Sequence, residues 1–235
     1  MGAPVPEGLL LIDKPRGWTS HDVVAALRAR LPRGTKVGHT GTLDPMATGL
    51  LVLLVGRATR EAGRLQGLDK VYTGRIRLGV ETDTADMEGR VVREAAVPPL
   101  DAPAVQAVFD EHLGALELPP PLYSAVKVKG RPLYDYARRG LAVEAAPRLQ
   151  RVQSWTLLRW EPPEAEFRLA CSSGTYVRSL AVSVGAKLGC GATVSQLRRE
   201  KVGTFDVQDA VSAEQAKQEP LEIFVGRVQA LSCVR

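Results

Sequence analysis

The chain has 235 residues, 45% of them hydrophobic and 24% charged, which suits one sizeable domain or a domain with an appendage. No run approaches the ~20 apolar residues that a membrane-spanning helix needs. The N-terminal residues lack the basic leader of a signal peptide. The three cysteines, Cys171, Cys190 and Cys233, are widely spaced and contain no CxxC pair, which indicates neither a disulfide framework nor a zinc site. We therefore expect a cytoplasmic protein.

The net charge of +5 is unevenly distributed along the chain. Residues 127–201 contain 14 Lys and Arg against 6 Asp and Glu, a balance of +8, whereas the remainder contains 17 against 20, a balance of −3. A basic stretch in a slightly acidic chain is typical of a polyanion-binding face. A solvated basic surface without a partner would explain the charge equally well.

The first third of the chain reads as strand, helix, glycine-rich loop and strand. The stretch GLLLIDKPRGW, residues 8–18, predicts a short strand that ends in a Pro/Gly turn, and residues 20–31 predict a helix with Thr19 or Ser20 as N-cap. Residues 33–49 hold four glycines and a proline, which indicates a structured loop. The run LLVLLVG after it is typical of a fully buried strand.

The rest of the chain mixes strands and helices without a regular βαβ period. The alternation over residues 70–80 predicts a strand with Tyr72 on one face and Arg75 on the other. Further expected elements are a turn-rich connection at 81–92, a helix at 101–114, a hairpin with a short helix within 118–140, strands at 149–160 and 165–171, a helix from about Thr175, and a short helical C-terminus. This order favours an α+β fold with a mixed, mostly antiparallel central sheet flanked by helices and loops.

Several common chemistries have no support in the sequence. A GxxxxGK[ST] phosphate loop and a GxGxxG motif are both missing, so we expect no nucleotide cofactor. His21, His39 and His112 lack the spacing of metal ligands, so we expect no metal. The segments CSSG and VYTG are not nucleophile elbows, which disfavours a serine hydrolase.

One acid is conspicuous. Asp44 lies between glycine-rich turns and an almost unbroken apolar run, where a carboxylate needs a cation or several donors. Asp-Pro with flanking glycines is also a common turn, so the residue could serve the backbone alone. Small neighbours equally allow a ligand to approach the backbone closely.

The segment GHTGTLDPMATGLLVLLVGRATR, residues 38–60, resembles the signature loop of the TruB-type tRNA pseudouridine synthases, which holds a nucleophilic aspartate. Other segments resemble the same family in chain order: LLLIDKPRGWTSHDVV, KVYTGRIRLGVETDTADMEG, PPLYSAVKVKGRPLYDYARRG and CSSGTYVRSLAVSVGAKLGCGATVSQLRREKVGTF. The resemblance covers nearly all of residues 8–206. It implies the pseudouridine-synthase fold, with a catalytic domain over residues 1–210, an RNA-gripping insertion at 118–150, and a short helical tail at 211–235 that is too short for a complete PUA-type domain.

The resemblance also implies a reaction and its catalytic residues. Uridine 55 in the T loop of tRNA would be isomerised to pseudouridine, without a cofactor or an obligatory protein partner, by an enzyme that we expect to be a monomer. Asp44 would attack covalently at C6 of uracil or at C1′ of ribose, and both routes stay open. Arg178 would pair with Asp44, and Tyr72 would lie against the uracil as a candidate base.

Further residues carry over as contacts to the RNA. His39 would stack where flipped nucleotides leave room, and Leu197 would line the uracil pocket. The full expected substrate-binding set is Lys14, His39, Gly41, Thr42, Tyr176 and Leu197. The T stem-loop would be bound by Lys127, Lys129, Arg131, Arg138 and Arg139, interleaved with Tyr123, Tyr134 and Tyr136.

The chain departs from the family pattern after Arg178, where residues 180–185 lack two acids that many relatives carry, and at Thr193, where relatives have histidine. Two other functions remain open. The protein could bind tRNA and help its elbow fold without catalysis, or it could be the catalytic subunit of a guide-RNA particle.

Overall fold

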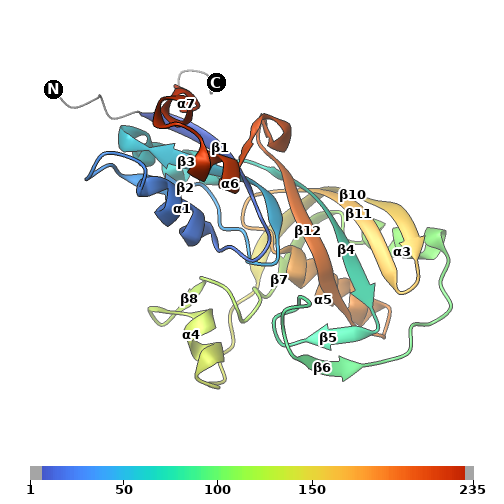
Figure 1. Cartoon of the computed structure of the whole chain (residues 1–235). Coiled ribbons are helices and arrows are strands. Elements are labelled where there is room, and N and C mark those ends of the chain that lie inside the picture. The colour runs from blue at the N-terminus through green and yellow to red at the C-terminus, as the bar shows by residue number, and fades with distance from the viewer. Residues whose placement is uncertain (1–6, 231–235) are drawn as a thin grey trace. The chain divides into compact units, whose positions relative to one another are not determined.

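The computed structural model describes residues 7–230, so Cys233 and the last five residues of the predicted tail lie outside the described residues. The chain forms two compact units (Figure 1). Unit 1 comprises Met1–Val71 with Arg198–Arg235, and unit 2 comprises Tyr72–Leu197. The boundaries fall inside two strands, β4 (Lys70–Leu78) and β12 (Ala192–Val202).

Unit 1 is built on a mixed sheet whose strands follow the order β14, β1, β3, β12. Strand β1 runs antiparallel to β3, with Lys14 opposite Gly49, and β12 runs parallel to β3, with Arg199 opposite the same Gly49. The elements of this unit besides β12 are β1 (Gly8–Lys14), α1 (Ser20–Arg28), β2 (Val37–His39), β3 (Thr48–Val55), a 3₁₀ turn (Gly56–Glu61), α2 (Ala62–Gln66), β13 (Phe205–Asp206), a second 3₁₀ turn (Val207–Asp209), β14 (Val211–Ser212), α6 (Ala213–Gln218) and α7 (Leu221–Gly226).

The sequence of β3 explains its central place. Its residues after Thr48 are all buried, as expected of a strand that is covered on both faces. Helix α1 begins as predicted, because the Thr19 hydroxyl accepts from the Asp22 N–H and the Asp22 carboxylate accepts from the Thr19 N–H. This capping box satisfies two groups that the first turn leaves unpaired.

Unit 2 contains the strands that continue the same ten-stranded sheet beyond β12, in the order β4, β11, β10, β7, and β11, β10 and β7 are antiparallel neighbours. Phe109 of α3, the first helix of unit 2 (Ala102–Asp110), stacks on Trp155 with ring centroids 4.3 Å apart, and Phe167 contacts both rings edge-on. Besides β4 the elements are β5 (Val80–Thr82), β6 (Val91–Glu94), α3 (Ala102–Asp110), β7 (Gly114–Leu118), β8 (Lys127–Val128), β9 (Arg131–Pro132), α4 (Leu133–Arg138), β10 (Arg148–Glu161), β11 (Glu164–Cys171) and α5 (Val177–Lys187).

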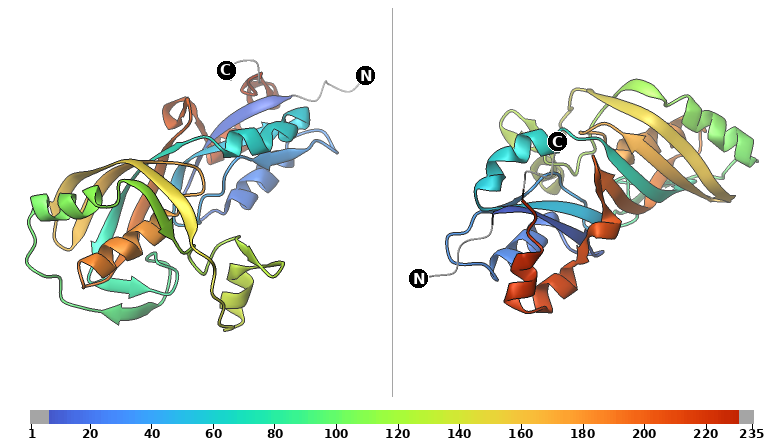
Figure 2. Two further views of the ribbon diagram at one scale, coloured as in Figure 1. Left: turned by 180° about the vertical axis from the view of Figure 1, so that it is seen from behind. Right: turned by 90° about the horizontal axis from the view of Figure 1, so that it is seen from above.

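The alternation predicted for β4 is confirmed, with Tyr72 on the buried face and Arg75 and Arg77 on the other. Those two arginines pair with acids of β11, Arg75 with Glu166 and Arg77 with Glu164. The predicted strands at 149–160 and 165–171 are confirmed as β10 and β11, which Figure 2 shows with α3 packed against them.

The predicted hairpin and short helix within 118–140 are confirmed as β8, β9 and α4, which stand apart from the large strands of unit 2 (Figure 1). The hairpin turns at Lys129 and Gly130, whose φ angles are +50° and +80°. Two positive φ angles are what a two-residue type I′ turn requires. A lysine in this region is uncommon, so the turn presents Lys129 at a cost in backbone energy.

The architecture is therefore α+β with mixed, mostly antiparallel strands, as predicted. Among the helices of residues 7–230, none combines the length and the apolar character needed to cross a membrane.

Gly49 is the residue whose missing side chain lets β12 lie against β3. Its φ is +100°, and a Cβ there would lie 2.3 Å from the Arg199 carbonyl oxygen. We expect Gly49→Ala to lower the free energy of unfolding by about 2–4 kcal/mol, because it combines left-handed strain with a backbone collision. Urea denaturation of the purified protein measures this change.

The matched control is Gly63→Ala in α2, where nothing lies within 4 Å of the added methyl group. This substitution should raise stability by up to about 1 kcal/mol, because alanine favours the helix over glycine. Equal urea midpoints for the two variants would contradict the role of Gly49.

Candidate active site

The loop of residues 40–47 joins β2 to β3 and carries Asp44. Leu43, Met46 and Ala47 point into the core, whereas Thr42 and Pro45 are exposed. A loop packed this closely must satisfy its backbone groups without a strand or helix ladder. Buried side chains from three elements of unit 1 perform this task.

Two of these side chains come from the N-terminal elements. The Ser20 hydroxyl accepts from the Leu43 N–H at 2.8 Å and donates to the Leu43 carbonyl at 3.1 Å. The Lys14 ammonium, fully buried, donates to the carbonyls of Pro15, Trp18 and Pro45. Lys14 thus stabilises the loop through its hydrogen bond to the Pro45 carbonyl. Its direct contact with substrate stays a prediction.

The third is Arg199 of β12. Its Nε donates to the Leu50 carbonyl at 2.7 Å, and its Nη2 donates to the Gly41 carbonyl at 3.0 Å. Sequence reasoning missed this residue, although a signal existed. Because residues two apart on a strand share a face, the expected burial of Leu197 placed Arg199 on the buried face too.

Asp44 opens a tight turn through its main chain. Its carbonyl accepts from the Ala47 N–H at 3.1 Å, and Pro45 occupies the second position, where proline is favoured. The Asp44 side chain is half-buried.

His39 precedes this turn at the end of β2 and is partly exposed. Its Nδ1 accepts from the Gly41 N–H at 3.3 Å. Burial lowers the pKa of His39, and the positive charges of Arg199 and His21 lower it further. The lowered pKa favours the neutral form of the His39 ring, and its stacking on RNA stays a prediction.

In unit 2, Arg178 is held at the start of α5 with only 4% of its surface exposed. Its Nη1 donates to the Thr84 carbonyl at 2.9 Å and its Nη2 to the Tyr123 carbonyl at 3.0 Å. Its Nε lies 3.9 Å from the carboxylate of Asp86, which is also buried. Sequence reasoning did not single out Asp86, because nothing local in the segment TADMEG marks it as the neighbour of an arginine 92 positions later.

Tyr72 and Leu197 are buried in the strands of unit 2, each with 8% of its surface exposed. Tyr176 forms the N-cap of α5, and its N–H donates to the Gln150 side-chain oxygen at 2.9 Å. Unit 1 thus brings together Lys14, His39, Gly41, Thr42 and Asp44, and the remaining expected catalytic and pocket residues belong to unit 2.

Family models match both parts of the chain. The model for the N-terminal domain of the TruB family pseudouridylate synthases matches residues 28–177, and that for the C-terminal domain of tRNA pseudouridylate synthase B matches residues 178–222. The chain belongs to the TruB family of pseudouridylate synthases. The resemblance to this family is thereby confirmed, and the matched residues include the Asp44 loop and three of the four other segments.

Individual relatives agree with the family models. A protein of Opitutus terrae named tRNA pseudouridine synthase B is 46% identical over 215 residues, covering 92% of this chain and 89% of that protein. A protein of Aromatoleum aromaticum with the same name is 46% identical and covers 94% of this chain and 71% of its own length. A solved structure titled "Crystal Structure of a Cbf5-Nop10-Gar1 Complex" has a TM-score of 0.71 at 28% identity, covering 95% of this chain and 60% of that one.

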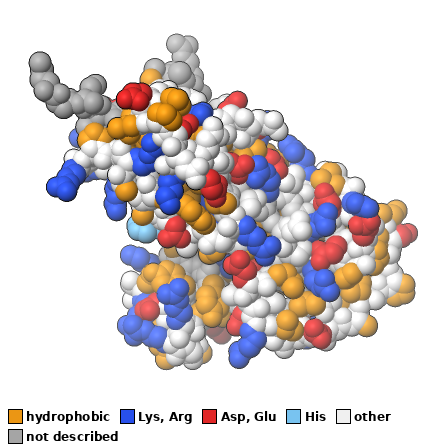
Figure 3. All heavy atoms as spheres, in the orientation of Figure 1, with side chains coloured by type: hydrophobic (Ala, Val, Ile, Leu, Met, Phe, Trp, Pro, Cys, Tyr) orange, Lys and Arg blue, Asp and Glu red, His pale blue; other side chains and the backbone are white. Residues whose placement is uncertain are grey.

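The insertion of this TruB family member carries the cations expected to contact RNA. Asp135 pairs with both Arg131 and Arg139, at 3.3 and 3.4 Å. Arg138 lies over the ring of Tyr134. Lys127 and Lys129 are exposed, and neither has an ion pair within residues 7–230. Figure 3 shows Lys and Arg side chains gathered around apolar ones over this part of the chain.

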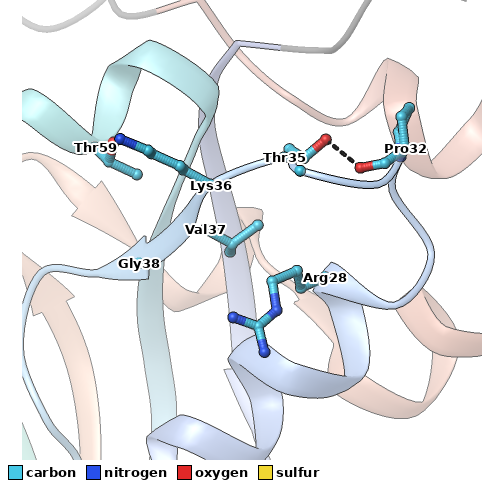
Figure 4. A pocket seen from close by; sticks show the side chains of 8 residues that line it. Arg28, Pro32, Thr35, Lys36, Val37, Gly38 and Thr59 are labelled. Atoms are coloured by element: carbon cyan, nitrogen blue, oxygen red, sulfur yellow. Dashed lines mark hydrogen bonds between the residues drawn. The ribbon is translucent and has the colours of Figure 1, made fainter.

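A second basic surface lies in unit 1, outside the basic stretch that the sequence indicated. A hollow of about 660 Å³ opens beside β2 and is lined by Arg28, Lys36 and Thr59 among others (Figure 4). Within the described part of the chain, neither cation has an ion pair. The signal in the sequence is that residues 23–43 contain four Lys and Arg and no acid. Basic surface in this TruB family member therefore extends beyond residues 127–201.

The lowered pKa of His39 predicts a pH dependence of stability. Because the folded pKa lies below the ordinary value of about 6.5, the unfolded chain binds more protons as the solution is acidified. The free energy of unfolding should therefore be highest above about pH 7 and should fall as the pH drops through 6.5 toward the lowered pKa. Urea titrations of the TruB-family chain between pH 5 and 8 measure this slope, which His39→Gln should flatten.

The control is His21→Gln, which removes an exposed imidazole and should leave most of the pH slope in place. A slope that His39→Gln leaves unchanged would contradict the assignment to His39.

Proposed function

We propose that this chain is a tRNA pseudouridine synthase that isomerises uridine 55 in the T loop, without a cofactor and without an obligatory protein partner. The observation that carries the proposal is the backbone of residues 40–47, which Lys14, Ser20 and Arg199 fix around Asp44. Relatives named tRNA pseudouridine synthase B at 46% identity support tRNA as the substrate.

In the proposed reaction the glycosidic bond between N1 and C1′ breaks, the base rotates, and a bond from C5 to C1′ forms, while C5 loses a proton and N1 gains one. Asp44 is the proposed nucleophile, attacking either C6 of uracil or C1′ of ribose. A carboxylate can serve in this way when it stays ionised and is held in position. Lys14 and Arg199 donate hydrogen bonds to the backbone of the loop that holds Asp44 in position.

Arg178 is the proposed partner of Asp44. Its guanidinium is buried and fixed by two backbone carbonyls, so its orientation is set before substrate arrives. A guanidinium beside a carboxylate orients it and stabilises its charge. Asp86, whose carboxylate lies 3.9 Å from the Arg178 Nε, adds a negative charge beside the same guanidinium.

The remaining assignments concern the flipped nucleotide. A base in a folded T loop is stacked, so the enzyme must extrude it at a cost of a few kcal/mol. His39 is proposed to stack on the RNA, Tyr72 to lie against the uracil as a base, and Leu197 with Tyr176 to line its pocket. The burial of Tyr72 and Leu197 suits an apolar pocket for a nucleobase.

A guide-RNA particle is the alternative that one observation favours, since the Cbf5 structure is a complex with Nop10 and Gar1. The chain is 28% identical to that protein and 46% identical to proteins named tRNA pseudouridine synthase B, which favours tRNA. Activity on unmodified tRNA by the purified chain alone would exclude a requirement for partners.

Replacing Asp44 tests the proposal most directly. Asp44→Asn keeps the turn and removes the nucleophile, so we expect turnover to fall by at least about 10³-fold while tRNA binding is retained. Release of tritium from tRNA labelled at C5 of uridine measures turnover, and filter binding measures affinity.

Asp209→Asn, an exposed acid in the same unit, is the matched control and should keep normal turnover. Tritium release by Asp44→Asn at the wild-type rate would exclude aspartate catalysis. Normal turnover in Arg178→Ala would exclude the pairing of Arg178 with Asp44 but would leave Asp44 as the proposed nucleophile.

The insertion predicts a salt dependence of tRNA affinity. Each phosphate contact that is removed should lower the slope of log affinity against log salt by roughly 0.7–0.9. Lys127→Gln and Lys129→Gln remove the two insertion lysines that have no ion pair in the described residues, so each should flatten the slope. Equilibrium binding at several salt concentrations measures it.

Arg168→Gln is the comparison variant. Arg168 is an exposed cation on β11 within the same basic stretch, and its loss should leave the slope unchanged. Equal slopes for all variants and the wild type would remove the insertion from the RNA interface.

A further inference from the structure

Arg199 is a buried cation whose contacts are backbone carbonyls. Only 2% of its surface is exposed, and within residues 7–230 it forms no ion pair. Burying a charge is unfavourable unless hydrogen bonds compensate for the lost water. An aliphatic side chain would fill a strand position of this kind without that cost. The position therefore indicates a need for the hydrogen bonds that the guanidinium makes.

Those hydrogen bonds join the two ends of the Asp44 loop. Nη2 and Nη1 donate to Gly41 and Thr42, at 3.0 and 3.5 Å, immediately before the turn. Nε donates to Leu50, at 2.7 Å, on the strand that follows it. Serine and lysine side chains hold the later part of the loop, at residues 43 and 45. Arg199 is thus the side chain that ties residues 41 and 42 to β3.

The strand that carries Arg199 is itself locked in place. Its backbone passes over Gly49, where even a methyl group would collide with the Arg199 carbonyl. Arg199 and Gly49 are partners in the parallel ladder between β12 and β3. The backbone that carries the guanidinium is therefore fixed. If the hydrogen bonds of Arg199 were lost, we expect the loop to move and the strand to stay in place.

A guanidinium suits this place better than an ammonium group. Its N–H groups diverge in one plane and reach three carbonyls on both sides of the loop, whereas an ammonium is a point charge with a different set of directions. Its charge also acts at the residue before the loop, since it contributes to the lowered pKa of His39. Substitution can therefore separate the two properties, because Arg199→Lys keeps the charge without the planar arrangement of N–H groups, and Arg199→Met removes both.

We propose that Arg199 is a positioning residue of the synthase, which fixes residues 41–42 so that the Asp44 turn is presented in its reactive geometry. This inference rests on the proposed function, because it takes Asp44 as the nucleophile. Arg199 itself touches the backbone and not the reacting atoms. A displacement of about 1 Å in a catalytic group can cost on the order of 10²-fold in rate.

The test compares Arg199→Lys and Arg199→Met with Arg198→Met. Arg198 is the neighbour on the same strand, where it pairs with Asp13 at 2.7 Å, so the control removes an arginine and an ion pair without touching residues 41–42. Three quantities are measured for each variant: kcat and KM for tRNA, hydrogen exchange of the amides in residues 40–47, and the NMR titration of His39.

We expect both Arg199 variants to lower kcat by about 10–100-fold with little change in KM, and to speed exchange in residues 40–47. Arg199→Met should also raise the pKa of His39, because it removes a positive charge, whereas Arg199→Lys should leave it nearly unchanged. Arg198→Met should keep kcat within about 3-fold of wild type, with normal exchange in the loop.

Two results would overturn the inference. The first is normal kcat and normal loop exchange in both Arg199 variants. The second is a fall in kcat while loop exchange and the His39 titration stay unchanged, which would mean that Arg199 acts elsewhere. If the wild-type chain forms no pseudouridine, the proposed function fails, whereas exchange and titration still report whether Arg199 holds the loop. Arg199→Lys keeps the test available if Arg199→Met does not fold.

Discussion

The carbonyl groups of one loop, and the buried donors that satisfy them, are the constraint on which the candidate active site depends. Residues 40–47 turn sharply between two strands while Leu43, Met46 and Ala47 enter the core, so several of their backbone groups depend on side-chain partners. Ser20, Lys14 and Arg199 supply donors from the start of α1, the end of β1 and the strand β12. Removing one of these three side chains would leave a backbone group of the loop without its hydrogen-bond partner, which lowers stability where the group is buried.

This arrangement stabilises the loop that carries the proposed nucleophile of unit 1. Two cations, Lys14 and Arg199, are buried where they hold the loop. Apolar packing could hold a loop without the desolvation free energy that burying a charge requires. What the cations provide is a fixed backbone and positive charge at the place where an acid lies. Preorganised groups of this kind need not rearrange during a reaction, which is the general advantage of a rigid site. Gly49 belongs to the same design, because its bare backbone admits the strand that carries Arg199.

Unit 2 applies a similar principle to Arg178. Its guanidinium is also held by backbone carbonyls, those of Thr84 and Tyr123, with Asp86 nearby. The insertion of the same unit does the opposite and leaves Lys127 and Lys129 exposed at a hairpin. Buried arginines fix geometry, whereas exposed lysines suit a mobile, hydrated polyanion such as RNA.

The sequence alone determined the local elements and the family. Short-range sequence patterns predict the N-terminus of α1, the alternation of β4, the buried apolar strand β3 and the hairpin with α4. The segment around Asp44 is long enough to identify the TruB family. Only the tertiary structure decided which side chains support the loop. Ser20, Arg199 and Gly49 meet it through contacts between elements that lie far apart in the sequence, and no local pattern encodes such a contact. The same reason hid Asp86, whose burial beside Arg178 depends on a fold that brings residues 86 and 178 together.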